Sequence, residues 1–265
     1  MDFTGFLGND AIKRRLSGAF ASGRVAHSYL LCGPDGSGKH TLARSMAAAM
    51  QCTGRGELPC GVCTACRKVL SVQHPDVITV NDPEHKLIAV DVIRRMRADM
   101  FVRPNEGQRK IYILDQDMGE PSQNALLKIL EEPPEHLMFI LATTELHKVP
   151  ATILSRCQRF AFKRLRAEEI ASRLNFIAYQ EHIEIEPDAV NLLARLADGG
   201  MRDGVSLLDQ GASAAGGAVT LESVYASLGL AGERRTAELM QAIAQQDTAK
   251  ALTVFSSLYA AGKDV

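Results

Sequence analysis

Residues 33–39 constrain the fold of this chain more than any other segment. They read Gly-Pro-Asp-Gly-Ser-Gly-Lys, which fits the G-x-x-x-x-G-K pattern of a phosphate-binding loop. An apolar run at 28–32 precedes the loop, and an alanine-rich helical composition follows at 41–50. Glycines let such a loop curl so that several backbone N–H groups face one phosphate, and the next helix adds its positive end. This order predicts a nucleotide site in an α/β fold; the alternative is an ordinary glycine turn at a helix start.

The residue after the loop lysine departs from this pattern. Ser or Thr usually stands there to ligate Mg²⁺, but this chain has His40. Mg²⁺ prefers oxygen to imidazole, and Thr41 points about 100° away around the helix. We therefore expect ATP or ADP to bind, with Mg²⁺ as the accompanying ion, and hydrolysis to be weak. The candidate contacts are Gly33, Gly36, Ser37, Gly38, Lys39, His40 and Thr41.

A second acidic element follows the apolar run at 110–114. Asp115 ends that run, in the place where a Walker B aspartate holds the metal through water. The next residue is Gln116, where a glutamate would orient the attacking water, and a Gln side chain cannot take up a proton at neutral pH. The alternative is that Asp115 only caps the following helix.

Four of the six cysteines crowd into one short segment, with the spacing Cys52-x7-Cys60-x2-Cys63-x2-Cys66. Closely spaced thiolates on a short loop can surround one tetrahedral ion, and four sulfur ligands favour a closed, structural Zn²⁺ site. An iron–sulfur cluster and metal-free thiols are the alternatives.

The remaining pattern alternates strands and helices and then becomes helical. We expect strands at 28–32, 77–80, 110–114, 137–142 and 160–162, and helices at 8–23, 41–50, 89–100 and 123–130. Such alternation with short connections indicates a parallel sheet with helices on both faces. Beyond residue 163 we expect helices at 166–180, 187–197, 201–214, 220–228 and 232–262. The predicted domains are 1–163 with the cysteine module at 52–66, an all-α domain at 164–216, and a helical domain at 217–265 that is cut short.

Composition excludes several classes of protein. The net charge of −1 gives no global basic surplus for nucleic-acid binding, and the absence of Trp argues against a base-stacking platform. The opening residues lack the pattern of a signal peptide, and no apolar run approaches the ~20 residues of a membrane span. We expect a cytoplasmic protein without membrane contact, in which clustered cysteines favour a metal over disulfides.

Three strings complete a resemblance to a known family. They are Asn-Ala-Leu-Leu-Lys-Ile-Leu-Glu-Glu-Pro-Pro at 124–134, Ala-Thr-Thr at 142–144 and Thr-Ile-Leu-Ser-Arg-Cys at 152–157. Together with the phosphate loop and the cysteine module, they resemble the ATPase-like subunits of bacterial DNA polymerase III clamp loaders, over roughly residues 5–215. The resemblance implies an AAA+ domain with an inserted zinc module, then a helical lid and the start of a helical collar.

The resemblance also assigns roles to residues. Asp115 would be the Walker B acid, and Thr144, with Thr143 as the alternative, the polar sensor beside it. Arg156 resembles an arginine finger, which would stabilise phosphate charge in the site of a neighbouring subunit; the alternative is an ordinary surface ion pair. Arg202 resembles the lid arginine that reaches back to the phosphates. The implied partners are other clamp-loader subunits in a hetero-oligomeric ring, a sliding clamp, and primed DNA held by the assembly.

Two subfamilies fit different parts of the chain. The opening residues, His40, Gln116 and the His-Pro-Asp string at 74–76 resemble delta prime, whose own nucleotide site is often degraded. Residues 200–210 and 142–155 resemble gamma/tau. We expect the delta prime type, a subunit that supplies Arg156 to a neighbour, hydrolyses little ATP itself and supports ATP-dependent clamp loading during replication. The alternatives are an ATP-hydrolysing gamma/tau-type motor subunit and an unrelated AAA+ ATPase.

Overall fold

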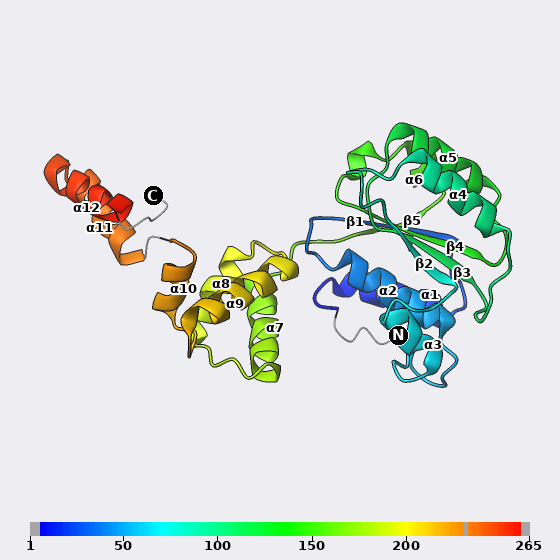
Figure 1. The fold of residues 1–265 in the computed structure, drawn as a ribbon, viewed down its shortest axis with the longest axis horizontal. Helices are drawn as coiled ribbons and strands as arrows, with labels where there is room; N and C mark the ends of the chain where they lie inside the picture. The colour runs from blue at the N-terminus through cyan, green and yellow to red at the C-terminus, as the bar shows by residue number, and fades with distance from the viewer. Residues whose placement is uncertain (1–5, 231–232, 261–265) are drawn as a thin grey trace. The chain divides into compact units, whose positions relative to one another are not determined.

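The computed structural model describes residues 6–230 and 233–260. The chain divides into two compact units, Met1–Leu165 and Arg166–Val265, each of which is described by itself (Figure 1). In the described part, none of the helices combines the length and the apolar character that a membrane crossing needs.

A five-stranded parallel sheet forms the centre of the first unit, with strand order β2-β3-β4-β1-β5 (Figure 1). Its strands are β1 (Ser28–Cys32), β2 (Val77–Val80), β3 (Lys110–Leu114), β4 (Leu137–Thr143) and β5 (Gln158–Ala161). Every residue of β1, β3 and β4 is buried, because helices cover both faces of a parallel sheet and its strands are therefore apolar throughout. The expectation of a parallel α/β sheet is confirmed.

Helices cover both faces of this sheet (Figure 1). On one face lie α1 (Asp10–Ala21), α2 (Lys39–Gln51) and α3 (Thr64–Leu70), and on the other α4 (Val90–Met100), α5 (Glu120–Glu131) and the short α6 (Ala151–Leu154). A 3₁₀ turn, η1 (Leu146–Lys148), follows β4. Because side chains alternate along a strand, Tyr29 and Leu31 of β1 enter the core under α2, while Leu30 enters the opposite core under α5.

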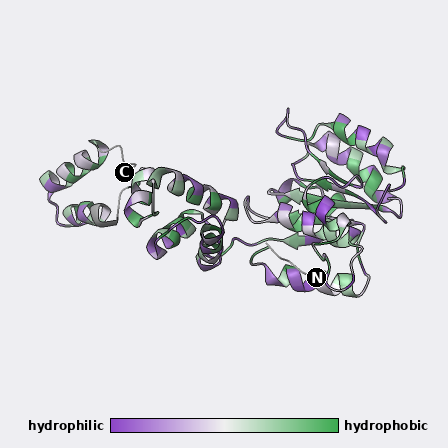
Figure 2. Ribbon diagram, turned by 60° about the horizontal axis from the view of Figure 1, so that its bottom comes forward, coloured by the Kyte–Doolittle hydropathy of each residue, from purple (hydrophilic) through white to green (hydrophobic). Residues whose placement is uncertain are grey.

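The second unit is helical. Its elements are α7 (Ala167–Gln180), α8 (Pro187–Leu196), α9 (Met201–Ala215), α10 (Leu221–Ser227), α11 (Glu233–Ala244) and α12 (Thr248–Ala260). Gly204 lets α9 pass close to α7, since a Cβ there would lie 3.1 Å from a methyl carbon of Ile170. The helices show purple and green along their length in Figure 2, as expected when one side packs and the other faces water.

Some expected boundaries are wrong. The single helix expected at 232–262 is two helices within the described residues, because Gln246 takes a left-handed conformation at φ 58° and the Asp247 carboxylate accepts a hydrogen bond from the N–H of Lys250. The last strand begins at Gln158 rather than at residue 160, and α3 and α6 were not expected. Both unexpected helices are short, at 7 and 4 residues, so they carry little periodic signal.

The His-Pro-Asp string at 74–76 anchors a loop of the sheet. Asp76 is fully buried, and its carboxylate accepts hydrogen bonds from the backbone N–H groups of Asn105, Glu106 and Gly107 at 2.6–2.8 Å. Burial alone would raise the pKa of Asp76, but these N–H groups outweigh it and hold the pKa below the usual 3.8. His74 stays close by, with its Nδ1 accepting from the N–H of Asp76. The string therefore has a structural role in this chain.

Replacing Asp76 with Ala should lower the free energy of unfolding by about 1–3 kcal/mol, because N–H groups of the 105–107 loop lose a charged acceptor. Because the folded pKa is depressed, the contribution is complete above the unfolded value near 3.8 and is lost as the pH falls through the folded value. Chemical denaturation at pH 7 and pH 3 measures both effects. The exposed Asp91→Ala is the control, and an equal loss in the two variants would contradict the anchoring role.

Candidate nucleotide-binding site and cysteine cluster

The phosphate-binding loop follows β1 directly and ends where α2 begins. Gly36 and Gly38 have φ of 66° and 89°, values that side chains rarely allow. Gly33 passes close to the end of β5: a Cβ there would lie 2.7 Å from the Cβ of Phe162 and 2.9 Å from its carbonyl oxygen. The glycine positions of the motif are therefore required by backbone conformation and close contact in this structure.

Lys39 folds back over the loop. Its Nζ donates hydrogen bonds to the carbonyl oxygens of Gly33 at 2.9 Å and Pro34 at 2.7 Å, and Ser37 Oγ also donates to Pro34 at 2.7 Å. The residue is buried, and this desolvation lowers the pKa of its amine. A desolvated cation at the start of a helix is suited to an anionic ligand, which would restore charge balance.

His40 lies against Asp115, the first acid after β3. The distance between His40 Nδ1 and Asp115 Oδ2 is 2.5 Å, and each side chain is about one-third exposed, at 31% and 33%. Nδ1 is itself buried and has no aligned hydrogen-bond partner among the described residues, so the two atoms converge without forming a proper hydrogen bond. Thr41 is exposed, as its position one residue further around the helix implies. The structure thus brings the residue after the loop lysine close to Asp115.

Gln116 points away from this pair and holds a neighbouring loop. Its Oε1 accepts from the N–H of Asp82 at 2.8 Å, and its Nε2 donates to the carbonyl oxygens of Asp82 at 3.3 Å and His85 at 2.5 Å. The Asp82 carboxylate in turn accepts from the N–H of Ala89, the residue that precedes α4. The side chain in the usual glutamate position therefore joins the end of β3 to the start of α4.

Asp117 was not expected as a site residue, and Thr143 was expected only as the alternative to Thr144. Thr143 Oγ1 donates to Asp117 Oδ1 at 2.6 Å, and Thr143 is the last residue of β4, directly beside Cys32 of β1. Thr144, the preferred sensor candidate, is exposed, so Thr143 is the threonine that faces the acids. Thr143 is the last residue of β4, whose residues are all buried, whereas Thr144 lies just beyond the end of the strand.

A pocket of about 550 Å³ borders these two residues, and Leu30, Leu114 and Leu141 are among its apolar lining residues. Asp117 and Thr143 line its polar side, together with Gln123 and Lys148. The residues of the glycine loop do not line it, so it adjoins the candidate nucleotide site but is separate from it.

Arg156 lies at the other end of the sheet. It follows α6 and precedes β5, and β5 starts opposite Tyr29, near the amino end of β1, whereas the glycine loop follows the carboxyl end of β1. Its guanidinium donates to the carbonyl oxygen of Thr152 at 2.8 Å and pairs with Glu131 at 3.1 Å. Because Arg156 lies at the amino end of β5, it is away from the chain's own phosphate loop. Arg202, by contrast, is an exposed residue of α9 in the second unit.

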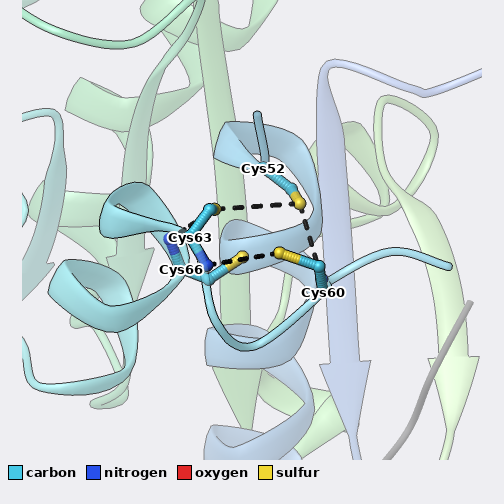
Figure 3. Close-up of side chains that lie close together, drawn as sticks. All are labelled: Cys52, Cys60, Cys63 and Cys66. Atoms are coloured by element: carbon cyan, nitrogen blue, oxygen red, sulfur yellow. Dashed lines mark hydrogen bonds between the residues drawn. The ribbon is translucent and has the colours of Figure 1, made fainter. Parts of the chain in front are cut away.

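The four clustered cysteines converge in space. Their sulfur atoms all lie within 4.8 Å of one another, and Cys63 Sγ is 4.0 Å from Cys52 Sγ (Figure 3). Four thiolates at the ~2.3 Å zinc–sulfur distance would have their sulfurs about 3.8 Å apart, so the spacing fits a tetrahedral ion. A Cβ on Gly54 would lie 2.7 Å from Cys60 Sγ, so a glycine is required against the sulfurs. Cys32 and Cys157 belong to other parts of the first unit.

The backbone prepares this cluster for a cation. The N–H groups of Cys60, Cys63 and Cys66 each point to a preceding sulfur at 3.4 Å. Burial opposes ionisation of Cys63, but N–H donors from Cys66 and Thr53 outweigh it and lower the pKa of its thiol to about 5, whereas burial and the bond to Cys63 raise the pKa of Cys66. Ionised sulfur is the form that binds metal. The cluster also contacts the core, because Cys66 is fully buried beside α2 and its sulfur lies 3.6 Å from the carbonyl oxygen of Ala48.

Family models match almost the whole chain. Residues 8–166 match the model described as DNA polymerase III, delta subunit. Residues 169–217 match DNA polymerase III clamp loader subunit, ATPase lid domain, and residues 219–265 match DNA polymerase III subunits gamma and tau domain III.

Curated relatives agree with these matches. DNA polymerase III subunit tau of Bacillus subtilis is 37% identical over 265 residues, which covers 99% of this chain and 47% of the relative. Subunit tau of Escherichia coli is 36% identical over 263 residues, covering 98% and 41%. Subunit gamma of Buchnera aphidicola subsp. Acyrthosiphon pisum is 31% identical over 263 residues, covering 98% and 72%. The chain therefore spans less than half the length of these tau relatives.

Among solved structures, the RuvB Holliday junction branch migration motor of Thermotoga maritima has a TM-score of 0.61 at 18% identity, over 90% of this chain and 76% of that one. That likeness shows a shared fold: a parallel α/β sheet of the P-loop type followed by helices. The delta prime type that we expected is not favoured, because the relatives are gamma and tau subunits and the last family model is theirs. The chain belongs to the bacterial DNA polymerase III clamp-loader subunits, and within that family the comparisons favour the gamma/tau type.

Proposed function

We propose that this chain is a gamma/tau-type clamp-loader subunit that binds ATP and supports ATP-dependent loading of a sliding clamp onto primed DNA. It would work in a hetero-oligomeric ring with other clamp-loader subunits, and its DNA contact would come through the assembly. The observation that carries the proposal is the buried Lys39 in a fully formed glycine loop, within a chain matched by gamma and tau relatives over almost its whole length.

The proposed nucleotide contacts follow from the loop. Backbone N–H groups of the 33–39 loop and the Lys39 amine would hold the phosphates, with Ser37 holding the loop in shape. Asp115 would hold a divalent metal ion together with the residue after the lysine, and Thr143, rather than Thr144, would sense the phosphate end through Asp117. Arg202 would reach the phosphates from the lid at 164–216, and residues 217–265 would form the beginning of the collar.

Arg156 would act in trans. Its position at the opposite end of the sheet from the glycine loop is what a residue needs if it serves the site of a neighbouring subunit and not its own. A guanidinium there would stabilise the negative charge that develops on the transferred phosphate.

A second candidate function is nucleotide binding with little turnover. Gln116 supports it, because its amide is fully engaged with the backbone of the 82–85 loop and offers no base to a water molecule. In this case the chain would act through Arg156 and through its subunit contacts.

We further propose that the four-cysteine cluster holds one structural Zn²⁺. Four sulfur donors, their close spacing and the N–H groups directed at them support zinc. The ion would fasten the 52–66 segment to α2 and α3, and with all coordination positions filled by protein it would have no catalytic role.

Calorimetry with a non-hydrolysable ATP analogue and a divalent ion tests the function. The unmodified chain should bind at micromolar concentration, and Lys39→Ala should abolish binding, because the phosphates lose their buried cation.

Arg156→Ala should keep this affinity and lower turnover at the adjacent site of a reconstituted complex by on the order of a thousandfold. Arg159→Ala, an exposed arginine nearby in β5, is the control. Equal turnover in the Arg156 and Arg159 variants would refute the role in trans, and absence of binding by the unmodified chain would refute nucleotide binding.

Elemental analysis should find one zinc per chain, and Cys63→Ser should lose it. The melting temperature should fall by roughly 5–10 °C, as expected for a loss of about 2–3 kcal/mol in a chain of this size. Cys157→Ser, outside the cluster, should keep the metal. An iron–sulfur absorption spectrum, or a metal-free protein of unchanged stability, would contradict the zinc assignment.

A further inference from the structure

The residue after the loop lysine carries a nitrogen donor where this class of site normally has a hydroxyl. His40 Nδ1 is buried, lies 2.5 Å from Asp115 Oδ2 and has no aligned hydrogen-bond partner among the described residues. The two atoms lie at ion-pair distance but are not aligned for a hydrogen bond, and a cation bound by both would account for their convergence.

The surroundings favour a cation at this point. Lys39 interacts electrostatically with the carboxylates of Asp35, Asp115 and Asp117, so three negative charges lie near the loop. An ion shared by His40 and Asp115 would have one imidazole nitrogen and one carboxylate oxygen from the protein. Phosphate oxygens of the nucleotide and water would complete its coordination.

The chemistry of this donor pair discriminates between ions. Mg²⁺ is a hard cation that binds oxygen and accepts imidazole poorly, whereas first-row transition ions bind imidazole readily and tolerate carboxylate and phosphate oxygen. Replacing a hydroxyl with an imidazole therefore weakens a site for Mg²⁺ and strengthens it for Mn²⁺ and the ions that follow it in the series. Thr41 cannot reverse this change, because it is exposed on another side of α2.

We propose that the nucleotide site of this chain takes a divalent first-row transition ion in preference to Mg²⁺, and that His40 and Asp115 are its protein ligands. This inference rests on the proposed nucleotide binding. It changes the expected metal requirement from the one that the sequence motif alone would suggest.

Calorimetry on the zinc-loaded protein compares the two ions. Affinity for a non-hydrolysable ATP analogue should be on the order of tenfold higher with Mn²⁺ than with Mg²⁺. His40→Thr, which restores the usual hydroxyl, should remove this preference and gain affinity with Mg²⁺. Mn²⁺ is the right probe because it stands lowest in the affinity series and will not displace Zn²⁺ from the four cysteines, whereas Co²⁺ competes more strongly.

Pulsed electron paramagnetic resonance gives a readout that does not depend on affinity. With Mn²⁺ and the analogue bound, the spectrum should show ¹⁴N coupling from a directly bound imidazole, and His40→Asn should abolish it. His182→Asn is the control, because His182 is exposed in the second unit and has φ 57°, which Asn accepts readily. Circular dichroism confirms that each variant is folded. His40→Thr tests the ion preference and His40→Asn tests the nitrogen coupling, so two different replacements test the same residue.

The possible outcomes separate this inference from the proposed function. Binding with equal affinity for the two ions and without ¹⁴N coupling, or binding that needs no divalent ion, overturns the metal assignment and leaves nucleotide binding in place. No binding with any ion, in the unmodified chain and in His40→Thr alike, overturns both.

Discussion

The parallel pairing of β1 with β4 and β5 determines where everything else in the first unit lies. β1 is buried along its whole length, and its last residue, Cys32, lies opposite Thr143 of β4 and Ala161 of β5. A strand hydrogen-bonded on both sides cannot slip by one residue without turning its apolar side chains from one core to the other. The glycine loop, Asp115 and Thr143 therefore meet at the carboxyl ends of their strands, at one end of the sheet. The geometry of the candidate site is a consequence of strand register.

Much of this arrangement was predictable from local sequence. Continuous apolar runs identified the strands, and the spacing of glycines before Lys39 identified the loop, because both patterns reflect requirements of the backbone itself. The cysteine spacing indicated a common site for the same reason. Where the chemistry of a position depends only on its immediate neighbours along the chain, the sequence was sufficient.

The failures concern contacts between distant segments. Nothing near Gln116 in the sequence indicates that its amide would bind the 82–85 loop, and nothing near His40 reveals the orientation of its ring toward Asp115. Thr143 and Thr144 are identical residues, and one is buried and the other exposed because β4 ends between them. The break between α11 and α12 was missed because the turn uses Gln246, a residue without the conformational signature of Gly or Pro. The resemblance to delta prime rested on the opening residues, on the string at 74–76 and on the single positions His40 and Gln116, and matches to gamma and tau relatives along the whole chain outweigh it.

The placement of Arg156 and the glycine loop at opposite ends of one sheet has a consequence for symmetry. Two copies related by a two-fold axis bury the same patch on both partners, so such a pair cannot place the arginine of each subunit in the loop of the next around a ring. Contacts that join one end to the other are head-to-tail, and they repeat in one direction only. An assembly built on them has a polarity, and wherever it fails to close, one terminal subunit retains an arginine without a neighbouring loop and the other a loop without a neighbouring arginine.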